Sequence, residues 1–312
     1  MSCLLDPGEL YELHAGAGAD LGLDRPVLVH ALTGFIDAGS AGRLVRDHLL
    51  EHFEHRLVAT FDIDQLLDYR SRRPPMIFIE DHWESYEEPA LALHVVRDAA
   101  GVPFLLLEGA EPDVQWERFL QAVVDLVRRF DVRLSVGVHG IPMGLPHTRP
   151  TGVTAHATRP ELVSGYPPWI GTVQVPGSMG NLLEYRLGQA GHDAMGFAVH
   201  VPHYLAQAEY PDAARVLLES VSQAGELVLP ARELQEAAER TRAEVDEQVS
   251  ASTEVLAVVQ ALEAQYDAYV DARGQGNPLT GTDGSVPTAE ELGAELERFL
   301  AEQARRNTDP DG

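Results

Sequence analysis

The apolar positions of the chain alternate between short buried runs and helical stripes. Residues 26–32 form a short run rich in Val and Leu, which is typical of a strand buried on both faces. Residues 33–42 are a turn rich in small residues. From residue 41 the apolar positions return every three or four residues, as on one face of a helix. This strand, glycine-rich turn and helix predict the opening unit of an α/β fold.

The middle of the chain predicts a mixed sheet covered by helices. Four apolar runs between residues 57 and 107 have no helix between them, so antiparallel or edge pairing is expected. Amphipathic stretches elsewhere have the spacing of helices that cover a sheet. Strands are expected at residues 57–61, 76–79, 90–96, 104–107, 134–138, 153–157, 172–175 and 195–201. Helices are expected at residues 111–130, 177–187 and 212–224.

The composition changes near residue 230. Residues 230–272 are rich in Ala, Glu, Gln and Arg, and their apolar positions alternate by four and three, the heptad spacing of a packed helix. The spacing is weakened at Gln248 and Ser252, so one long helix and a helical hairpin are both compatible with it. We therefore predict a core domain over residues 1–228, a helical extension over 229–272, a flexible linker over 273–288, and a short helix with a frayed tail over 289–312.

Composition narrows the classes of function. The formal net charge of −26 disfavours binding to a nucleic-acid backbone or to an anionic membrane surface. All 23 basic residues are arginines, which excludes a Schiff-base lysine and a lysine on nucleotide phosphates. The single cysteine, Cys3, cannot form an internal disulfide or a cysteine metal cluster. No signal peptide or transmembrane stretch is visible, so we expect a cytoplasmic protein, and we expect no cofactor.

Three glycine-rich turns are the strongest candidates for a ligand site. If the strands before them are parallel neighbours, the turns meet at one rim of the sheet, where open α/β sheets bind ligands. Backbone N–H groups and serine hydroxyls there could hold an anion, with Arg149 supplying charge and His139 a proton. The candidate residues are Gly34, Asp37, Gly39, Ser40, His139, Arg149, Gly177, Ser178, Gly180 and Asn181. The glycines would also serve tight turns and close helix–strand packing without a ligand, and both interpretations remain open.

Histidine and carboxylate clusters are weaker candidates. His48, Glu51 and His52 match the H-x-x-E-H pattern of inverted zincins, in which two histidines one helical turn apart bind zinc. The sequence identifies no third ligand, so we interpret the histidines as solvated on the outer face of a surface helix. Residues 80–84 bring three carboxylates and a histidine together after a strand, which we interpret as a polar loop at a sheet edge. A serine nucleophile is not supported, because G-S-M-G at residues 177–180 is not G-x-S-x-G.

Three segments together resemble the proteasome assembly chaperone 2 family, in its bacterial, actinobacterial-type branch. They are TGFIDAGSAG at residues 33–42, GVHGIPMGLPHTRP at 137–150 and VPGSMGNLLEYRLGQAGHDAMGFAVHVPHYL at 175–205. The resemblance covers residues 10–225. It implies a three-layer α/β/α sandwich with a mixed sheet, like that of purine nucleoside phosphorylases and related hydrolases, followed by an α-helical C-terminal extension.

The resemblance also implies a function through protein contacts. Eukaryotic and archaeal relatives help proteasome subunits to assemble, and self-association is expected, with a trimer as the favoured homo-oligomer. We therefore expect a non-enzymatic, self-associating protein, with proteasome subunits or related assembly factors as further candidate partners. The alternative is a small-molecule hydrolase or nucleoside-phosphorylase-like enzyme that uses the glycine-rich rim. Archaeal-type factors dock through a hydrophobic-Tyr-X ending, whereas this sequence ends Asp-Pro-Asp-Gly, so docking through the tail is not expected.

Overall fold

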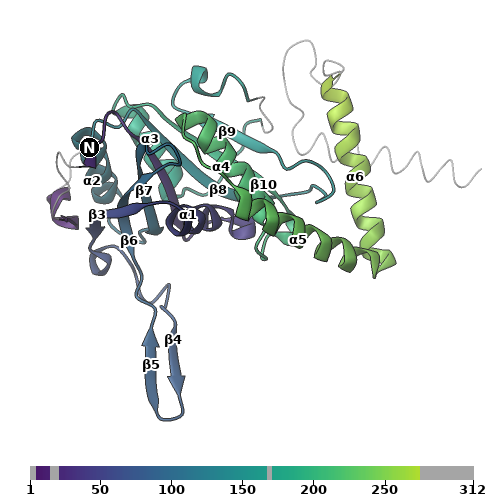
Figure 1. The fold of residues 1–312 in the computed structure, drawn as a ribbon, viewed down its shortest axis with the longest axis horizontal. Coiled ribbons are helices and arrows are strands. Elements are labelled where there is room, and N and C mark those ends of the chain that lie inside the picture. The colour runs from purple at the N-terminus through teal and green to yellow at the C-terminus, as the bar shows by residue number, and fades with distance from the viewer. Residues whose placement is uncertain (1–4, 15–20, 167–170, 275–312) are drawn as a thin grey trace, which may run out of the picture. The chain divides into compact units, whose positions relative to one another are not determined.

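The computed structural model describes residues 5–14, 21–166 and 171–274. The chain divides into two compact units, Met1–Glu263 and Ala264–Gly312, and the first contains an eight-stranded sheet (Figure 1). The spatial order of its strands is β1 (Tyr11–Leu13), β3 (His55–Phe61), β6 (Leu91–Arg97), β7 (Pro103–Ala110), β2 (Val27–Thr33), β8 (Leu134–Met143), β10 (Ala194–Pro202) and β9 (Val153–Ala157).

The sheet is mixed, as predicted. Strands β7, β2, β8 and β10 pair in parallel, while β1–β3, β3–β6, β6–β7 and β10–β9 pair antiparallel. The antiparallel pairing of β3, β6 and β7 confirms the expectation for strands that no helix separates. Because β2, β8 and β10 are parallel neighbours, their carboxyl ends lie at one edge of the sheet, as the candidate rim requires.

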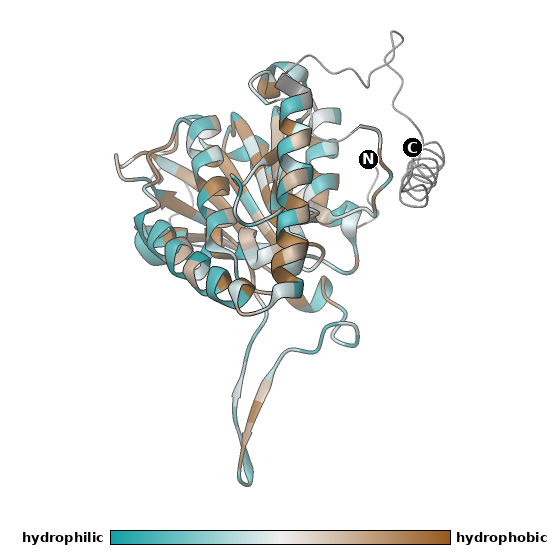
Figure 2. Cartoon of the chain, turned by 90° about the vertical axis from the view of Figure 1, so that its right-hand side faces the viewer, coloured by the Kyte–Doolittle hydropathy of each residue, from teal (hydrophilic) through white to brown (hydrophobic). Residues whose placement is uncertain are grey.

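Helices cover both faces of the sheet and complete the predicted three-layer sandwich. One hydrophobic core joins the sheet to α1 (Ala41–His52) and α4 (Pro211–Gly225). The other joins it to α2 (Trp116–Arg129) and α3 (Met179–Gln189). Strand β2 contributes to both, since Val27 and Val29 belong to the first core and Leu28 to the second. In Figure 2 the hydrophobic residues gather on the sheet and on the helix faces turned toward it.

Residues 76–79 form a strand, but not in the main sheet. The strand β4 (Met76–Ile79) pairs only with β5 (His82–Tyr86), in a separate two-stranded hairpin that stands away from the sandwich (Figure 1). Every residue of both strands is exposed. The prediction of a sheet strand was therefore wrong here, and so was the polar loop at residues 80–84, part of which is β5. We call residues 76–86 the arm.

One expected strand is absent, and several elements have other bounds than predicted. Residues 172–175 form no strand, and the side chains of Val173 and Val175 are each 60% exposed, so no buried face supports one. Helix α2 begins at Trp116 rather than near residue 111, after Gln115 in the left-handed region (φ 59°). Strand β8 runs into the expected loop as far as Met143, because its residues stay paired with β10 up to Pro202.

Within the described residues, two helices rather than one follow the core. Helix α5 (Arg232–Ser250) is followed, after a break of two residues, by α6 (Thr253–Gly274). Ser252 lies in the break, and its Oγ accepts a hydrogen bond from the N–H of Val255 at the start of α6. The break falls where the heptad spacing weakens. Buried Leu234 of α5 belongs to the core that contains α4. Among the described residues, no helix is long and apolar enough to cross a membrane. Of the predicted linker and tail, residues 275–312 lie outside the described part, and the predicted domain boundaries stay predictions.

Short 3-10 turns complete the described structure. They are η1 (Pro7–Leu10), η3 (Ala38–Ser40), η4 (Ile63–Gln65), η5 (Pro160–Val163) and η6 (His203–Leu205).

Candidate functional site

Asp37 organises the turn between β2 and α1. Its Oδ1 accepts hydrogen bonds from the N–H groups of Gly42 (2.8 Å) and Gly140 (2.9 Å), and its Oδ2 accepts one from Arg43 (3.0 Å). Two of these bonds satisfy N–H groups in the first turn of α1, so the Asp37 side chain caps this helix. Ser40, which occupies the N-cap position of α1, makes no such side-chain bond. The third bond ties the turn to β8, which leaves the carboxylate engaged with backbone rather than free for a ligand.

A small pocket lies at the same rim, beside the end of β2 and the start of α3. Its volume is about 40 Å³, room for a few water molecules. Phe35 and Ile36, which are 43% and 42% exposed, form part of its wall. Its polar lining residues are His30, Glu111, His139, His156, Ser178, Asn181 and Glu184.

His30 is the most unusual group in this pocket. It lies in the middle of β2 and is only 4% exposed, and its Nε2 has no hydrogen-bond partner among the described residues. Burial, followed by the nearby His139 and His156, lowers the pKa of His30 to about 4. Burial and His156 likewise lower the pKa of His139 to about 4, against the opposite effect of Asp37 and Glu184. Both rings are therefore neutral at pH 7.

Glycines make the space that these rings occupy. A Cβ on Gly137 of β8 would lie 2.5 Å from Cε1 of His30, and a Cβ on Gly196 of β10 would clash with the His156 ring. His156 in turn contacts Glu184 of α3, with 2.8 Å between Nδ1 and Oε2. Glycine at these two positions therefore serves the close approach of a histidine from the neighbouring strand.

The start of α3 is occupied by protein groups. Ser178 is its N-cap, and the Ser178 Oγ accepts a hydrogen bond from the N–H of Asn181 (3.3 Å). The N–H of Met179 donates to Oε1 of Glu111 at 2.6 Å. Burial raises the pKa of Glu111, although the bond from Met179 and the charge of Arg72 oppose the rise. Two carboxylates, Glu111 and Glu184, thus face the place where an anion would bind.

The pocket can hydrogen-bond a small polar molecule but is poorly suited to an anion. A neutral imidazole donates a hydrogen bond from one nitrogen and accepts one at the other, and an ionised carboxylate accepts only. The lining residues that the structure describes include no arginine. Arg149, proposed to supply charge, instead lies 3.2 Å from Oε1 of Glu263 through its Nη1.

The structure brings together only part of the predicted rim. His139, Ser178, Gly180 and Asn181 line the pocket. Asp37 is not in the lining, although it accepts a hydrogen bond from Gly140, the residue after His139. The other predicted rim residues are absent from the lining: Gly34, Gly39, Ser40, Arg149 and Gly177. Gly39 (φ 67°) serves close packing instead, since a Cβ there would lie 2.8 Å from Cβ of Tyr210.

Sequence reasoning missed four of the polar lining residues. They are His30, Glu111, His156 and Glu184. His30 carries a recognisable signal, because it is the one titratable side chain in the apolar run at residues 26–32. The other three come from separate segments that meet only in the folded chain.

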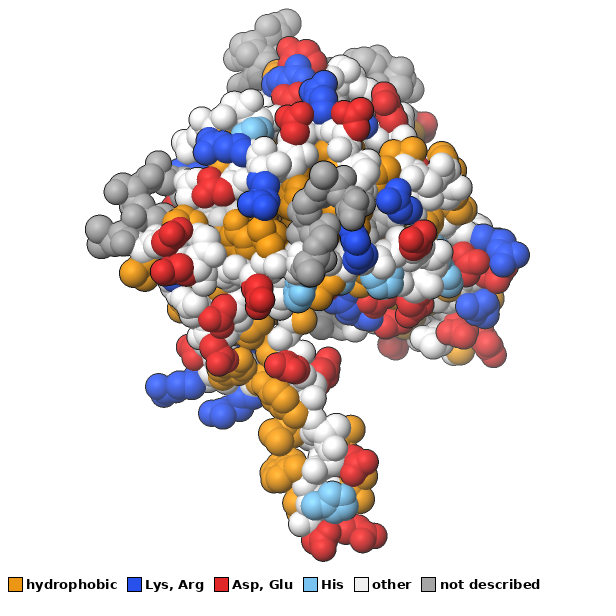
Figure 3. Space-filling view, turned by 60° about the vertical axis from the view of Figure 1, so that its left-hand side comes forward, with side chains coloured by type: hydrophobic (Ala, Val, Ile, Leu, Met, Phe, Trp, Pro, Cys, Tyr) orange, Lys and Arg blue, Asp and Glu red, His pale blue; other side chains and the backbone are white. Residues whose placement is uncertain are grey.

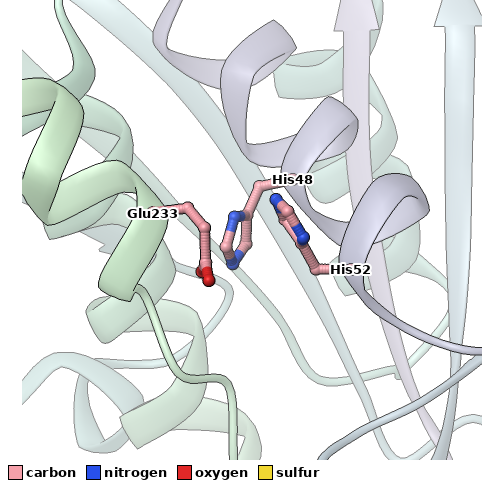
Figure 4. A group of neighbouring side chains, drawn as sticks. All are labelled: His48, His52 and Glu233. Carbon is pink, nitrogen blue, oxygen red and sulfur yellow. The ribbon is translucent and has the colours of Figure 1, made fainter.

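The H-x-x-E-H segment differs from its predicted solvated state. His48 is 4% exposed, and its Nε2 lies 2.9 Å from the carbonyl oxygen of Pro230. Burial lowers the pKa of His48, partly offset by this bond. The interpretation as a solvated histidine is therefore wrong for His48. His52 remains exposed and lies near His48 together with Glu233 of α5, whereas Glu51 is not part of this group (Figure 4).

The arm carries an unusual set of exposed apolar side chains. Trp83 is 63% exposed, Ile77 56% and Phe78 54%, and Met76, Ile79 and Tyr86 are also exposed. The rings of Phe78 and Trp83 are 5.1 Å apart and edge-to-face. Figure 3 shows apolar side chains along this projecting hairpin.

The fold defines the class of the protein: a three-layer α/β/α sandwich with a mixed sheet and C-terminal helices. A model of the PAC2 family matches residues 31–249. The chain therefore belongs to the PAC2 family, as the resemblance of its three segments indicated.

Three solved structures are similar over most of their length. Rv2714 of Mycobacterium tuberculosis, of unknown function, is 51% identical with a TM-score of 0.82, covering 88% of this chain and 95% of its own. A protein of unknown function from Corynebacterium glutamicum ATCC 13032 is 40% identical with a TM-score of 0.79, and the match covers 84% of this chain and 98% of that protein. The proteasome-assembly chaperone homologue Rv2125 of M. tuberculosis is 24% identical with a TM-score of 0.69, and the match covers 75% of this chain and 99% of that protein. No curated protein matches this chain.

Proposed function

We propose that this chain is a non-enzymatic PAC2 protein that associates with itself and acts through protein–protein contacts. The observation that carries the proposal is the arm, with its exposed apolar side chains. Membership of the PAC2 family supports it. The name of Rv2125, a proteasome-assembly chaperone homologue, supports proteasome subunits or related assembly factors as additional partners.

The physical argument for a partner is that the arm has no core of its own. An isolated two-stranded hairpin is marginally stable in water, and the Phe78–Trp83 pair adds about 1.5 kcal/mol at most. The arm exposes six large apolar side chains, and the free energy falls when another surface covers them. A group of exposed apolar side chains of this kind is typical of a protein interface.

A second copy of this chain is the occupant that we favour. Each copy brings its own arm, so arms packed on one another, or on the neighbouring copy, bury the apolar side chains of both molecules at once. An arm-to-arm contact closes as a two-fold dimer, and an arm-to-body contact closes as a ring, which accommodates a trimer.

The experiment is the mass of the full chain in solution, measured by sedimentation equilibrium over a range of concentrations. We expect a homo-oligomer for the unaltered chain and a monomer for Phe78→Ser/Trp83→Ser. The matched control is Val173→Ser/Val175→Ser, which alters two equally exposed apolar side chains away from the arm and retains the oligomer. An unaltered chain that stays monomeric, or an arm variant with unchanged mass, contradicts the proposal.

The proteasome part of the proposal has a separate test. The same measurement is repeated after mixing with purified proteasome α and β subunits. A stable complex with either subunit supports the assembly role. A homo-oligomer whose mass is unchanged on mixing rejects the proteasome partner while leaving self-association in place.

The enzyme alternative receives less support from the geometry. The enzyme alternative required four side chains around one pocket: Ser40, His139, Ser178 and Arg149. Only His139 and Ser178 line the pocket. The pocket is also too small, at about 40 Å³, for a nucleoside, since sites for such ligands are several hundred Å³ in volume.

A further inference from the structure

Two histidines of α1 and a glutamate of α5 converge on one point of the first unit. His48 and His52 are four residues apart on α1, so they lie on one face of the helix, and their ring centroids are 4.7 Å apart. Glu233, in the first turn of α5, reaches the same place from a distant part of the sequence (Figure 4). One ligand atom from each residue lies within 4.8 Å of those of the other two.

These separations are close to those of a bound metal ion. Tetrahedral zinc holds nitrogen and oxygen ligands at about 2.0–2.2 Å, which places the ligand atoms about 3.4 Å from one another. The three groups therefore need to approach by about 1.4 Å at most. His52 is exposed and Glu233 is half-buried, so both side chains can make this adjustment by rotation.

The buried member of the group is already held in place. Nε2 of His48 lies 2.9 Å from the carbonyl oxygen of Pro230, two residues before α5. Metal-bound histidines usually donate their second N–H to a carboxylate or a backbone carbonyl in this way, and the tautomer that does so here keeps its lone pair on Nδ1. The same contact links α1 to the residues that lead into α5.

We propose that His48, His52 and Glu233 form a binding site for a transition-metal dication, with zinc as the best match to two imidazoles and a carboxylate. The three protein ligands leave a fourth coordination position. A cavity of about 640 Å³ adjoins this position and is lined by His52 and Glu233 among others. The competing partner of Glu233 is Arg232, 3.3 Å away, whose side chain is 79% exposed and readily displaced.

The consequence of metal binding is a cross-link between the core and the helical extension. The ion would join α1, which belongs to the sandwich, to the first turn of α5. An ion that binds only the folded chain stabilises it according to its concentration and affinity. Zinc should therefore raise the unfolding temperature of the full chain.

The test is calorimetric titration of ZnCl2 into the full chain after removal of metals with a chelator, with Mg²⁺ as the comparison ion. We expect one saturable zinc per chain and no comparable Mg²⁺ binding, since Mg²⁺ prefers oxygen ligands. His52→Ala and Glu233→Gln should each weaken zinc binding at least tenfold and remove the zinc-dependent rise in unfolding temperature. Neither side chain is buried, so both variants should fold.

Glu51→Gln is the matched control. Glu51 belongs to the same H-x-x-E-H segment and carries the same charge as Glu233, but it lies outside the group. This variant should bind zinc like the unaltered chain. The proposal is overturned if the unaltered chain shows no saturable binding of one ion. It is also overturned if His52→Ala and Glu233→Gln bind zinc normally, or if Glu51→Gln loses binding as they do, since the ion would then bind elsewhere or respond only to net charge.

Discussion

The buried His30 makes the stability of the fold sensitive to acid. In the folded chain its pKa is lowered to about 4, mainly by burial, whereas an unfolded histidine titrates near pH 6.5. Between these two values the unfolded chain binds a proton that the folded chain does not. The free energy of unfolding therefore falls as the pH drops below 6.5, and this loss levels off below pH 4.

The size of this effect follows from the two pKa values. Moving from pH 7.5 to pH 5 protonates the unfolded ring almost completely and the folded ring hardly at all, which removes about 2 kcal/mol of stability from this one group. Other acid-sensitive groups contribute to the total loss, but they are common to the unaltered chain and to a variant at residue 30. The difference between the two chains isolates the contribution of His30.

The assay is urea unfolding at pH 7.5 and pH 5, followed by circular dichroism. His30→Gln should lose about 2 kcal/mol less than the unaltered chain between the two pH values. Val29→Ala, which destabilises the same strand through a fully buried neighbour without removing a titratable group, should lose as much as the unaltered chain. Equal losses in His30→Gln and the unaltered chain would refute the reasoning, because they would mean that the folded ring takes up its proton as readily as the unfolded one.

The opening unit of the fold was predictable because its signals are local. The apolar run of β2, the small-residue turn and the helix from residue 41 all depend on residues within one stretch, and the structure confirms them. The position of the arm was not predictable in this way. Met76–Ile79 is as apolar as a core strand, and only the absence of a covering layer, which is a tertiary property, distinguishes it.

In the candidate sites, too, residues with local signals were predictable and residues joined only by tertiary contacts were not. His139 and Ser178 follow turn signals that sequence reasoning can find, but His156 and Glu184 meet only because β9 pairs with β10 and α3 packs beside them. Glu233 is likewise a ligand candidate only because α5 returns to α1. Arg149 shows the opposite error, a residue assigned to the site that does not line it. It lies in the glycine-rich loop of the sequence, but in the fold its side chain pairs with Glu263.

Two further variants test how the rim is built. Asp37→Ala removes three backbone hydrogen bonds and should lower the free energy of unfolding by about 3 kcal/mol, measured by urea unfolding, while Asp37→Asn, which keeps one carbonyl acceptor, should lose less. Gly140→Ala tests the contact between β8 and the turn that precedes α1. A Cβ at residue 140 would clash with the carbonyl oxygen of Ala38, and because both groups are backbone, the strand or the turn must move, at a cost of about 3 kcal/mol. Gly144→Ala is the control, because its Cβ would meet no atom within 4 Å, and it should change stability by less than about 0.5 kcal/mol. Equal stability of the two alanine variants would show that β8 and the turn are not in close contact, and the anchoring of the rim through Asp37 and Gly140 would have to be abandoned.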